Sequence, residues 1–127
     1  MFELTINNEV YQFHFGMGFL REVNKKLSKP IDGVKDGKQN IGLQFTVAGI
    51  IDGDLETLVD VLDTANKDQK PRITRAALDA YIEDENTDID ALFEDVLGFL
   101  KSANATKKVT EALIAAVEAE RAKAAKA

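Results

Sequence analysis

The single histidine of the chain, His14, is the first residue to consider for acid–base chemistry, because imidazole titrates near neutral pH. It lies in a segment of alternating residues, which places it on the face opposite the aromatic side chains of Tyr11, Phe13 and Phe15. A structural or solvent-exposed role is therefore expected for His14. With one histidine and no cysteine, neither a helical histidine pair nor a thiolate site for zinc can form. No pattern brings a serine and an acid to His14, so we predict no catalytic residue.

Two glycines, Gly16 and Gly18, lie between a predicted strand and a predicted helix, where phosphate-binding loops occur. The dinucleotide motif needs a third glycine three residues further on, and Arg21 occupies that position. No strand–helix–strand repeat follows. We favour the interpretation that the glycines allow a sharp bend, and we keep a nucleotide-binding enzyme as an alternative.

The residues Asp84, Asn86, Asp88 and Asp95 match part of the spacing of a calcium-binding loop. The sixth position of that loop requires glycine and holds Ile89 instead, and its last ligand is an aspartate where a bidentate glutamate is usual. Calcium binding is therefore a minor alternative, and we expect no metal and no other cofactor.

The distribution of charge is uneven. The chain has 22 acidic and 16 basic residues, a net charge of -6, which opposes binding to nucleic acid and to anionic membranes. Residues 76–100 contain no lysine or arginine and many acids. They form either a solvated helix face or an acidic docking face for a basic partner. The residues of this predicted acidic docking face are Asp84, Glu85, Asp88, Asp90, Glu94 and Asp95.

The N-terminal segment has the alternation of an antiparallel hairpin. Apolar side chains recur at every second position in residues 2–6 and again in residues 9–15, and Asn7-Asn8 suits a two-residue turn with left-handed backbone. Such a turn makes the two apolar faces coincide. The pairs that it places opposite each other are Leu4 with Tyr11 and Phe2 with Phe13.

A bare hairpin is only marginally stable in water, so its aromatic face needs a cover. The segment after Gly18 predicts a covering helix that ends at residues 28–30 with Pro30. Its apolar residues at helical spacing are Phe19, Leu20, Val23 and Leu27.

The middle of the chain predicts a loop and then two helices. Residues 31–40 carry turn signals at Asp32-Gly33 and Asp36-Gly37, and we expect a loop with a short extended piece. Residues 42–51 are apolar on most sides, which predicts a buried helix. Asp52-Gly53 ends it, and Asp54 is expected to cap an amphipathic helix over residues 55–65.

Three further helices are predicted, each from a threonine cap. Thr74 precedes a short helix that follows a charged linker over residues 66–73. Thr87 with Asp90 has the form of a capping box, and Thr106 follows a break at Ser102. The apolar repeat of the helix after Thr87 is Ile89, Leu92, Phe93, Val96, Leu97 and Leu100.

The last predicted helix, residues 107–127, is rich in alanine, lysine and glutamate. Its apolar stripe is narrow and ends at Val117, so we expect the last ten residues to fray or to order with a partner. The stripe is either a partner-binding surface, a seam for self-association or an intramolecular contact. The predicted partner-binding residues are Phe99, Leu100, Val109, Leu113, Ile114 and Val117.

Together these elements predict an α+β, mainly α fold, with an N-terminal two-stranded β-hairpin followed by about five or six helices. We divide the chain into a hairpin plus helical domain, residues 1–106, and a C-terminal helix, residues 107–127. The N-terminus has a strand pattern instead of a signal peptide, and no apolar run approaches the roughly 20 residues that span a bilayer. We therefore expect a soluble, cytoplasmic protein.

Three segments in order, residues 2–7 (FELTIN), 11–25 (YQFHFGMGFLREVNK) and 91–108 (ALFEDVLGFLKSANATKK), resemble the tail assembly chaperones of long-tailed phages and prophages of Gram-positive bacteria. The resemblance spans residues 1–108 and depends on the ordered set. It implies a non-catalytic assembly factor, made in the cytoplasm of the host bacterium and absent from the mature virion.

The same resemblance implies that the partners are the tape measure protein, which the chaperone keeps soluble, and the tail tube (major tail) protein, whose subunits it helps to recruit. In many relatives a ribosomal frameshift also yields a longer product. The main alternative is a small acidic protein-binding or inhibitor domain that mimics nucleic acid. It predicts salt-sensitive binding, whereas a hydrophobic client contact survives salt.

Overall fold

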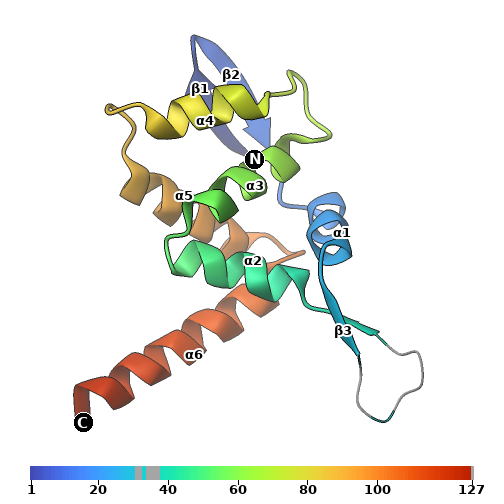
Figure 1. Cartoon of the computed structure of the whole chain (residues 1–127), viewed down its shortest axis with the longest axis vertical. Helices are drawn as coiled ribbons and strands as arrows, with labels where there is room; N and C mark the ends of the chain where they lie inside the picture. The colour runs from blue at the N-terminus through green and yellow to red at the C-terminus, as the bar shows by residue number, and fades with distance from the viewer. Residues whose placement is uncertain (31–32, 34–37, 127) are drawn as a thin grey trace.

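The computed structural model describes residues 1–30, 33 and 38–126. Within them an N-terminal antiparallel hairpin is followed by six helices, which confirms the predicted α+β, mainly α class (Figure 1). The elements in chain order are β1 (Phe2–Ile6), β2 (Glu9–Phe13), α1 (Met17–Lys25), β3 (Ser28–Pro30), β4 (Lys38–Asn40), α2 (Gly42–Ile51), α3 (Leu55–Asn66), α4 (Arg75–Glu83), α5 (Ile89–Ser102) and α6 (Lys107–Lys126).

The N-terminal hairpin has the predicted register. Phe2 pairs with Phe13 and Leu4 with Tyr11, and the turn residues Asn7 and Asn8 have φ of 53° and 65°. Both turn residues are therefore left-handed, as a two-residue turn of this type requires. The second strand ends at Phe13, two residues earlier than predicted.

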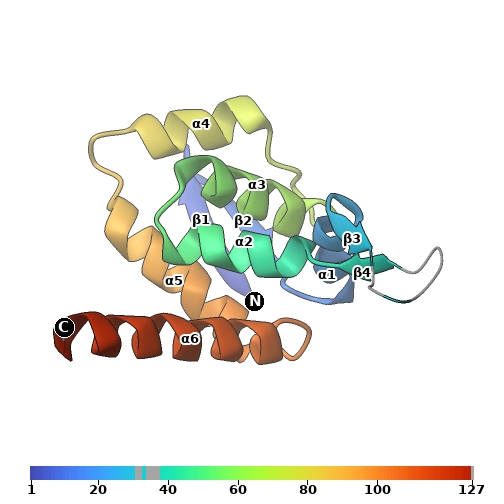
Figure 2. The ribbon, with the colours of Figure 1, turned by 60° about the horizontal axis from the view of Figure 1, so that its bottom comes forward.

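The aromatic face of the hairpin is covered mainly by α3 and α5. The ring centroids of Phe2 and Phe99 of α5 are 5.1 Å apart, and the backbone N–H of His14 donates to the carbonyl of Ala65 in α3 at 2.8 Å. In Figure 2 the hairpin lies behind α2 and α3. The predicted cover, α1, contributes Phe19 at its start, which packs edge-on against Phe15 just after β2.

The helix α1 is shorter than predicted. It ends at Lys25, so Leu27 lies outside it and is 37% exposed, and residues 28–30 form β3 rather than a terminator. The partner of β3 is β4, which is the short extended piece expected within residues 31–40. Gly33 has a φ of 79°, whereas the other residues of the two turn signals lie outside the described residues.

The helix α2 has the predicted bounds and a buried side. Its first residue, Gly42, lies so close to α1 that a Cβ there would come 1.9 Å from the carbonyl oxygen of Val23. Leu43, Val47 and Ile50 are buried, whereas Phe45 is exposed. The first residue of α2 must therefore be glycine, because no side chain fits between the backbones of α1 and α2 at this point.

Of the caps predicted for α3 and α4, the structure confirms the one for α4. Thr74 caps α4 by accepting a hydrogen bond from the N–H of Ala77. Asp54 precedes α3 as predicted, but its carboxylate accepts from the hydroxyl of Thr57 at 2.6 Å instead of from a backbone amide.

The predicted capping box at the start of α5 is wrong. Asp88 is the cap and accepts from the N–H of Ala91. The hydroxyl of Thr87 instead donates to the carbonyl of Tyr81 at 2.6 Å, which ties the start of α5 to α4. A carboxylate outcompetes a hydroxyl as an acceptor of amide hydrogen bonds, so the cap moves by one residue.

The C-terminal helix α6 packs against α2 and α5 along one edge of the protein (Figure 2). Thr106, the predicted cap, is buried, and its hydroxyl donates to the carbonyl of Leu100 at 2.6 Å. The helix continues to Lys126, and residues 118–125 are exposed. None of the helices in the described part of the chain is long and apolar enough to cross a membrane.

Candidate functional site

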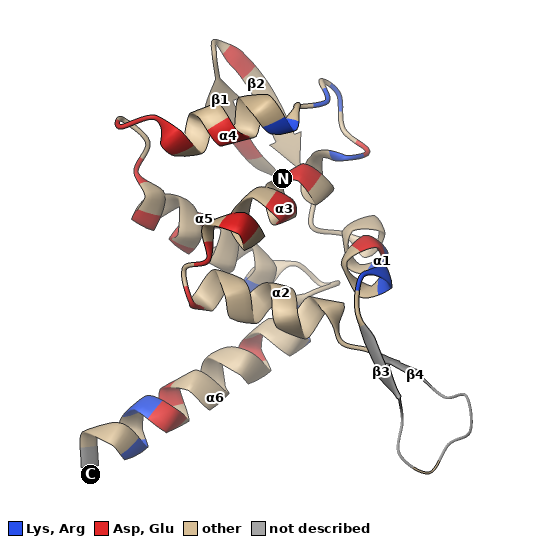
Figure 3. Ribbon diagram, viewed as in Figure 1, with Lys and Arg blue, Asp and Glu red and all other residues tan. Residues whose placement is uncertain are grey.

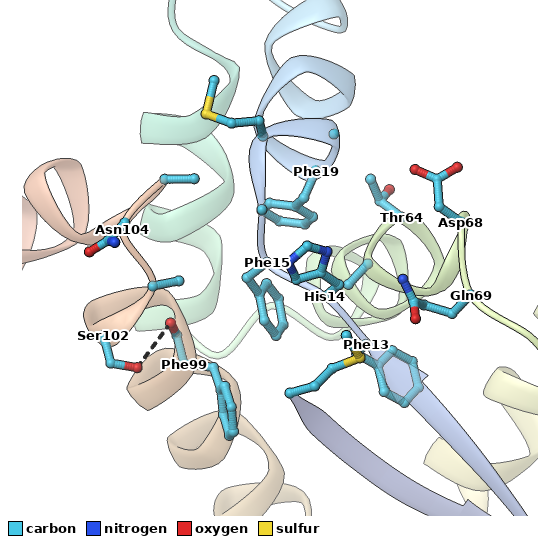
Figure 4. Close-up of a pocket in the computed structure, with 17 residues that line it drawn as sticks. Phe13, His14, Phe15, Phe19, Thr64, Asp68, Gln69, Phe99, Ser102 and Asn104 are labelled. Atoms are coloured by element: carbon cyan, nitrogen blue, oxygen red, sulfur yellow. Dashed lines mark hydrogen bonds between the residues drawn. The ribbon is translucent and has the colours of Figure 1, made fainter.

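A cavity of about 840 Å³ lies where β2, the start of α1, the end of α3 and the α5–α6 connection meet (Figure 4). Its inner wall is aromatic and its mouth is open to solvent. The phenylalanines that line it are Phe13, Phe15, Phe19 and Phe99. Three of them are nearly or fully buried, so Phe99, which is half-buried, is the ring that an incoming apolar group can contact.

Flexible and polar side chains surround the mouth of this cavity. Met1 and Met17 are 62% and 49% exposed. Methionine adapts its shape to different apolar partners, which suits a binding surface more than a catalytic site. The exposed His14 lies against Gly16, where a Cβ would come 2.7 Å from its ring.

The start of α1, beside this cavity, is the place where the alternative of a nucleotide-binding enzyme would put a phosphate. A carboxylate oxygen of Asp68 lies 3.3 Å from the position of a Cβ on Gly18, in the first turn of α1. A phosphate at this helix terminus would be repelled by the Asp68 carboxylate, which offsets the attraction of the helix N-terminus for an anion. The geometry therefore favours the bend interpretation of Gly16 and Gly18.

The predicted partner-binding residues separate into four environments. Phe99 lines the aromatic cavity, and Leu100 is fully buried in the core, where no partner can reach it without unfolding. Val109 and Leu113 are half-buried and pack against the core. Ile114 and Val117 line a separate groove between α2, α5 and α6.

This groove, called the α2–α5–α6 groove from here on, has a volume of about 250 Å³ and a mostly apolar lining. Glu94, Glu118 and Arg121 lie at its edges. The apolar residues that line it are Ile50, Ile51, Phe93, Leu97, Ile114 and Val117. It brings together apolar residues that are far apart in sequence, which the helical repeat alone could not reveal.

The residues of the predicted acidic docking face lie on the α4–α5 connection and on α5 (Figure 3). Burial, together with the charges of Asp84 and Asp95, raises the pKa of Tyr81. These two carboxylates therefore both lie near the Tyr81 hydroxyl. Figure 3 also shows acidic residues on α3 and α4. Glu56 and Asp60 of α3 join Asp79 and Glu83 of α4 around one groove, which sequence reasoning missed.

The residues of the calcium alternative serve local structure. Asp84 accepts a hydrogen bond from the N–H of Asn86, and Asp88 caps α5. Across residues 1–30, 33 and 38–126, no group of three or more histidine, cysteine, aspartate or glutamate side chains is arranged to hold a metal ion.

Open apolar grooves and an acidic surface on a small helical framework define a protein suited to binding other proteins. The family model of the phage tail assembly chaperone protein, TAC, matches residues 3–114. The chain therefore belongs to the phage tail assembly chaperone family, which confirms the resemblance of its three segments. No curated protein and no solved structure matches the chain.

Proposed function

We propose that this protein is a non-catalytic tail assembly chaperone that binds the tape measure protein and keeps it soluble. In this proposal it also helps to recruit tail tube subunits. It acts in the cytoplasm of a Gram-positive host and is absent from the mature virion. The observation that carries the proposal is the family match over residues 3–114, which reaches into α6.

The proposed client site is the α2–α5–α6 groove. A helix-in-groove contact needs an apolar channel that a client helix can enter with large side chains. Ile114 and Val117 are half-buried in the free chain, so a client can cover them without unfolding α6. Burial of a large apolar side chain contributes roughly 1.5–3 kcal/mol, which makes these positions sensitive to a charge.

The test is co-expression with the tape measure protein encoded in the same tail gene cluster. We expect soluble tape measure protein that co-purifies with the chaperone. The double variant Ile114→Asp and Val117→Asp should abolish both results, because two charged side chains replace the apolar surface of the groove and must lose water when a client helix covers them. Ala116→Asp is the matched control, since Ala116 is exposed on the same helix. If the tape measure protein is insoluble and unbound with the unchanged chain, the proposal fails.

The acidic surface favours a second candidate function, an inhibitor that mimics nucleic acid. Residues 76–100 lack lysine and arginine, and Glu56 and Asp60 of α3 line one groove with Asp79 and Glu83 of α4. This candidate predicts capture of a DNA-binding protein that salt abolishes, because exposed charges are screened within about 8 Å at physiological ionic strength. Client binding in an apolar groove should instead survive salt.

A further inference from the structure

Packing within the protein does not account for the exposure of the Phe45 side chain. It is 63% exposed, although it belongs to α2, whose neighbours Leu43 and Val47 are buried. Large apolar side chains at the edge of a groove are typical of sites that bind partners. Phe45 lines such a groove between the end of α1, α2 and α3, with a volume of about 500 Å³. We call it the Phe45 groove.

The floor of the Phe45 groove is made of small or buried apolar residues. Val23 and Val61 are buried, and Ala48 and Gly49 lie between them on α2. Gly49 is packed against Thr57, whose hydroxyl would come 2.6 Å from a Cβ at that position. Thr57 of α3 thus fills the space that a side chain at Gly49 would occupy. The floor beside Phe45 is therefore a packed surface of α2 and α3, on which an apolar side chain of a partner can pack.

The rim of the groove is negatively charged. Asp52, Asp54 and Asp60 line it together with the base Lys26. Asp60 is paired with Arg75 at 2.7 Å. Among the side chains that the structure describes, which do not include those of Lys29, Lys35 and Lys38, no lysine or arginine lies within ion-pair distance of Asp52 or Asp54. Asp52 and Asp54 are both exposed at the α2–α3 turn, where a basic partner can approach their carboxylates from solvent.

From this combination we infer that the Phe45 groove binds a basic amphipathic helix of a partner protein. A large apolar side chain of that helix packs against Phe45 and the floor, and a lysine or arginine next to it pairs with Asp52 and Asp54. Electrostatic complementarity of this kind selects partners and speeds association. The Phe45 groove shares no residue with the α2–α5–α6 groove, so the inference does not depend on the proposed client site.

The experiment uses the full chain and two fluorescently labelled synthetic helices with the same leucine face, one flanked by lysines and one by glutamates. Anisotropy titrations should show saturable binding of the lysine helix alone. Phe45→Ala should weaken that binding about tenfold, as expected for a central aromatic anchor. Val10→Ala is the matched control, because Val10 is 48% exposed on the hairpin, and should change the affinity less than about twofold.

The charge of the rim is tested separately. Asp52→Asn should weaken binding of the lysine helix several-fold at low salt and by less at high salt, because the lost interaction is an exposed ion pair. Glu120→Gln on the exposed end of α6 is the matched control and should have no effect. Circular dichroism of each variant establishes that the helix content is unchanged.

Four outcomes would overturn the inference. They are absence of binding, equal binding of the glutamate helix, equal loss with the control variants, and loss of binding in Val117→Asp, which would place the helix in the α2–α5–α6 groove. Sedimentation velocity tests a fifth outcome, self-association of the chain through the Phe45 groove. If the chain self-associates and Phe45→Ala makes it monomeric, the occupant is a second copy and the inference is wrong. None of these measurements involves the tape measure protein, so failure here leaves the proposed function standing.

Discussion

The side-chain oxygen of Asn66 accepts a hydrogen bond from the backbone N–H of Ile73 at 2.7 Å, inside the core. The same oxygen accepts from Arg72, and the side-chain nitrogen donates to the carbonyls of Gln12 at 2.9 Å and Pro71 at 3.1 Å. Asn66 therefore joins the end of α3 to the hairpin and to the linker before α4. It is fully buried, and all of its polar atoms are paired.

Asn66→Ala should lower the free energy of unfolding by about 2–4 kcal/mol, because it leaves several buried backbone groups without a partner. Urea denaturation followed by circular dichroism measures the change. Asn104→Ala is the control, since Asn104 is exposed, and should be nearly neutral. A loss below about 0.5 kcal/mol for Asn66→Ala would show that water replaces these hydrogen bonds.

Substitution by alanine should lower the stability of the protein at one glycine and raise it at another. Gly42→Ala places a methyl group 1.9 Å from a backbone oxygen of α1 and should destabilise the protein by about 3 kcal/mol. Gly98, within α5, has no atom within 4 Å of an added Cβ. Gly98→Ala should therefore raise the stability by about 0.5–1 kcal/mol, through the higher helix propensity of alanine. Thermal unfolding of both variants checks the contrast, and equal effects would contradict the close contact at Gly42.

The predicted partner-binding residues should separate into core and groove positions when they are truncated to alanine. Leu100→Ala should cost about 2–5 kcal/mol, because its side chain is fully buried. Val117→Ala should cost less than about 1 kcal/mol, since Val117 is half-buried at the edge of a groove. Chemical denaturation of both variants distinguishes the two roles. A large loss for Val117→Ala would mean that it belongs to the core.

The pH dependence of stability should depend in part on Glu22. Hydrogen bonds from Lys67 and Lys25 and their charges hold the pKa of Glu22 below its ordinary value of 4.5. A lowered carboxyl pKa stabilises the folded state above pH 4.5, and this contribution is lost as the pH falls through the lowered pKa.

Glu22→Gln should therefore melt at a lower temperature than the unchanged chain at pH 7, with the difference disappearing in acid. Melting temperatures recorded from pH 7 to pH 3 in steps provide the measurement, at about 10 mM salt to limit screening. Glu118→Gln serves as the control, because Glu118 is exposed on α6. A difference that is constant with pH would show that the ion pairs of Glu22 do not contribute.

Local patterns predicted those parts of the fold that depend on neighbours in the chain. The turn at Asn7-Asn8 fixes the register of the hairpin, so the pairing of Phe2 with Phe13 followed from alternation alone. The bounds of α2 followed from Gly42 and the break at Asp52-Gly53. In each case the residues that determine the structure lie within one element or at its ends.

The features that were missed depend on contacts between distant segments. The partners of Asn66 include Gln12, which is 54 residues away in the sequence. The residue types around Asn66 predict a charged linker and give no sign that its side chain is buried. Leu27 has the spacing of a helix residue, but α1 ends earlier, and the backbone of Leu27 pairs with Ile41 at the edge of the short β3–β4 ribbon. Likewise, the separation of Leu100 from Val117 depends on how α6 lies on α2 and α5.

The absence of lysine and arginine from residues 76–100 also determines which reagents can report on α4 and α5. Trypsin cleaves after basic residues, so it releases these helices as one peptide, residues 76–101. Amine-directed cross-linkers find no target between Arg75 and Lys101. A partner bound to the acidic docking face would therefore leave no lysine cross-link there, whereas carbodiimide coupling, which joins carboxylates to amines, would mark its position.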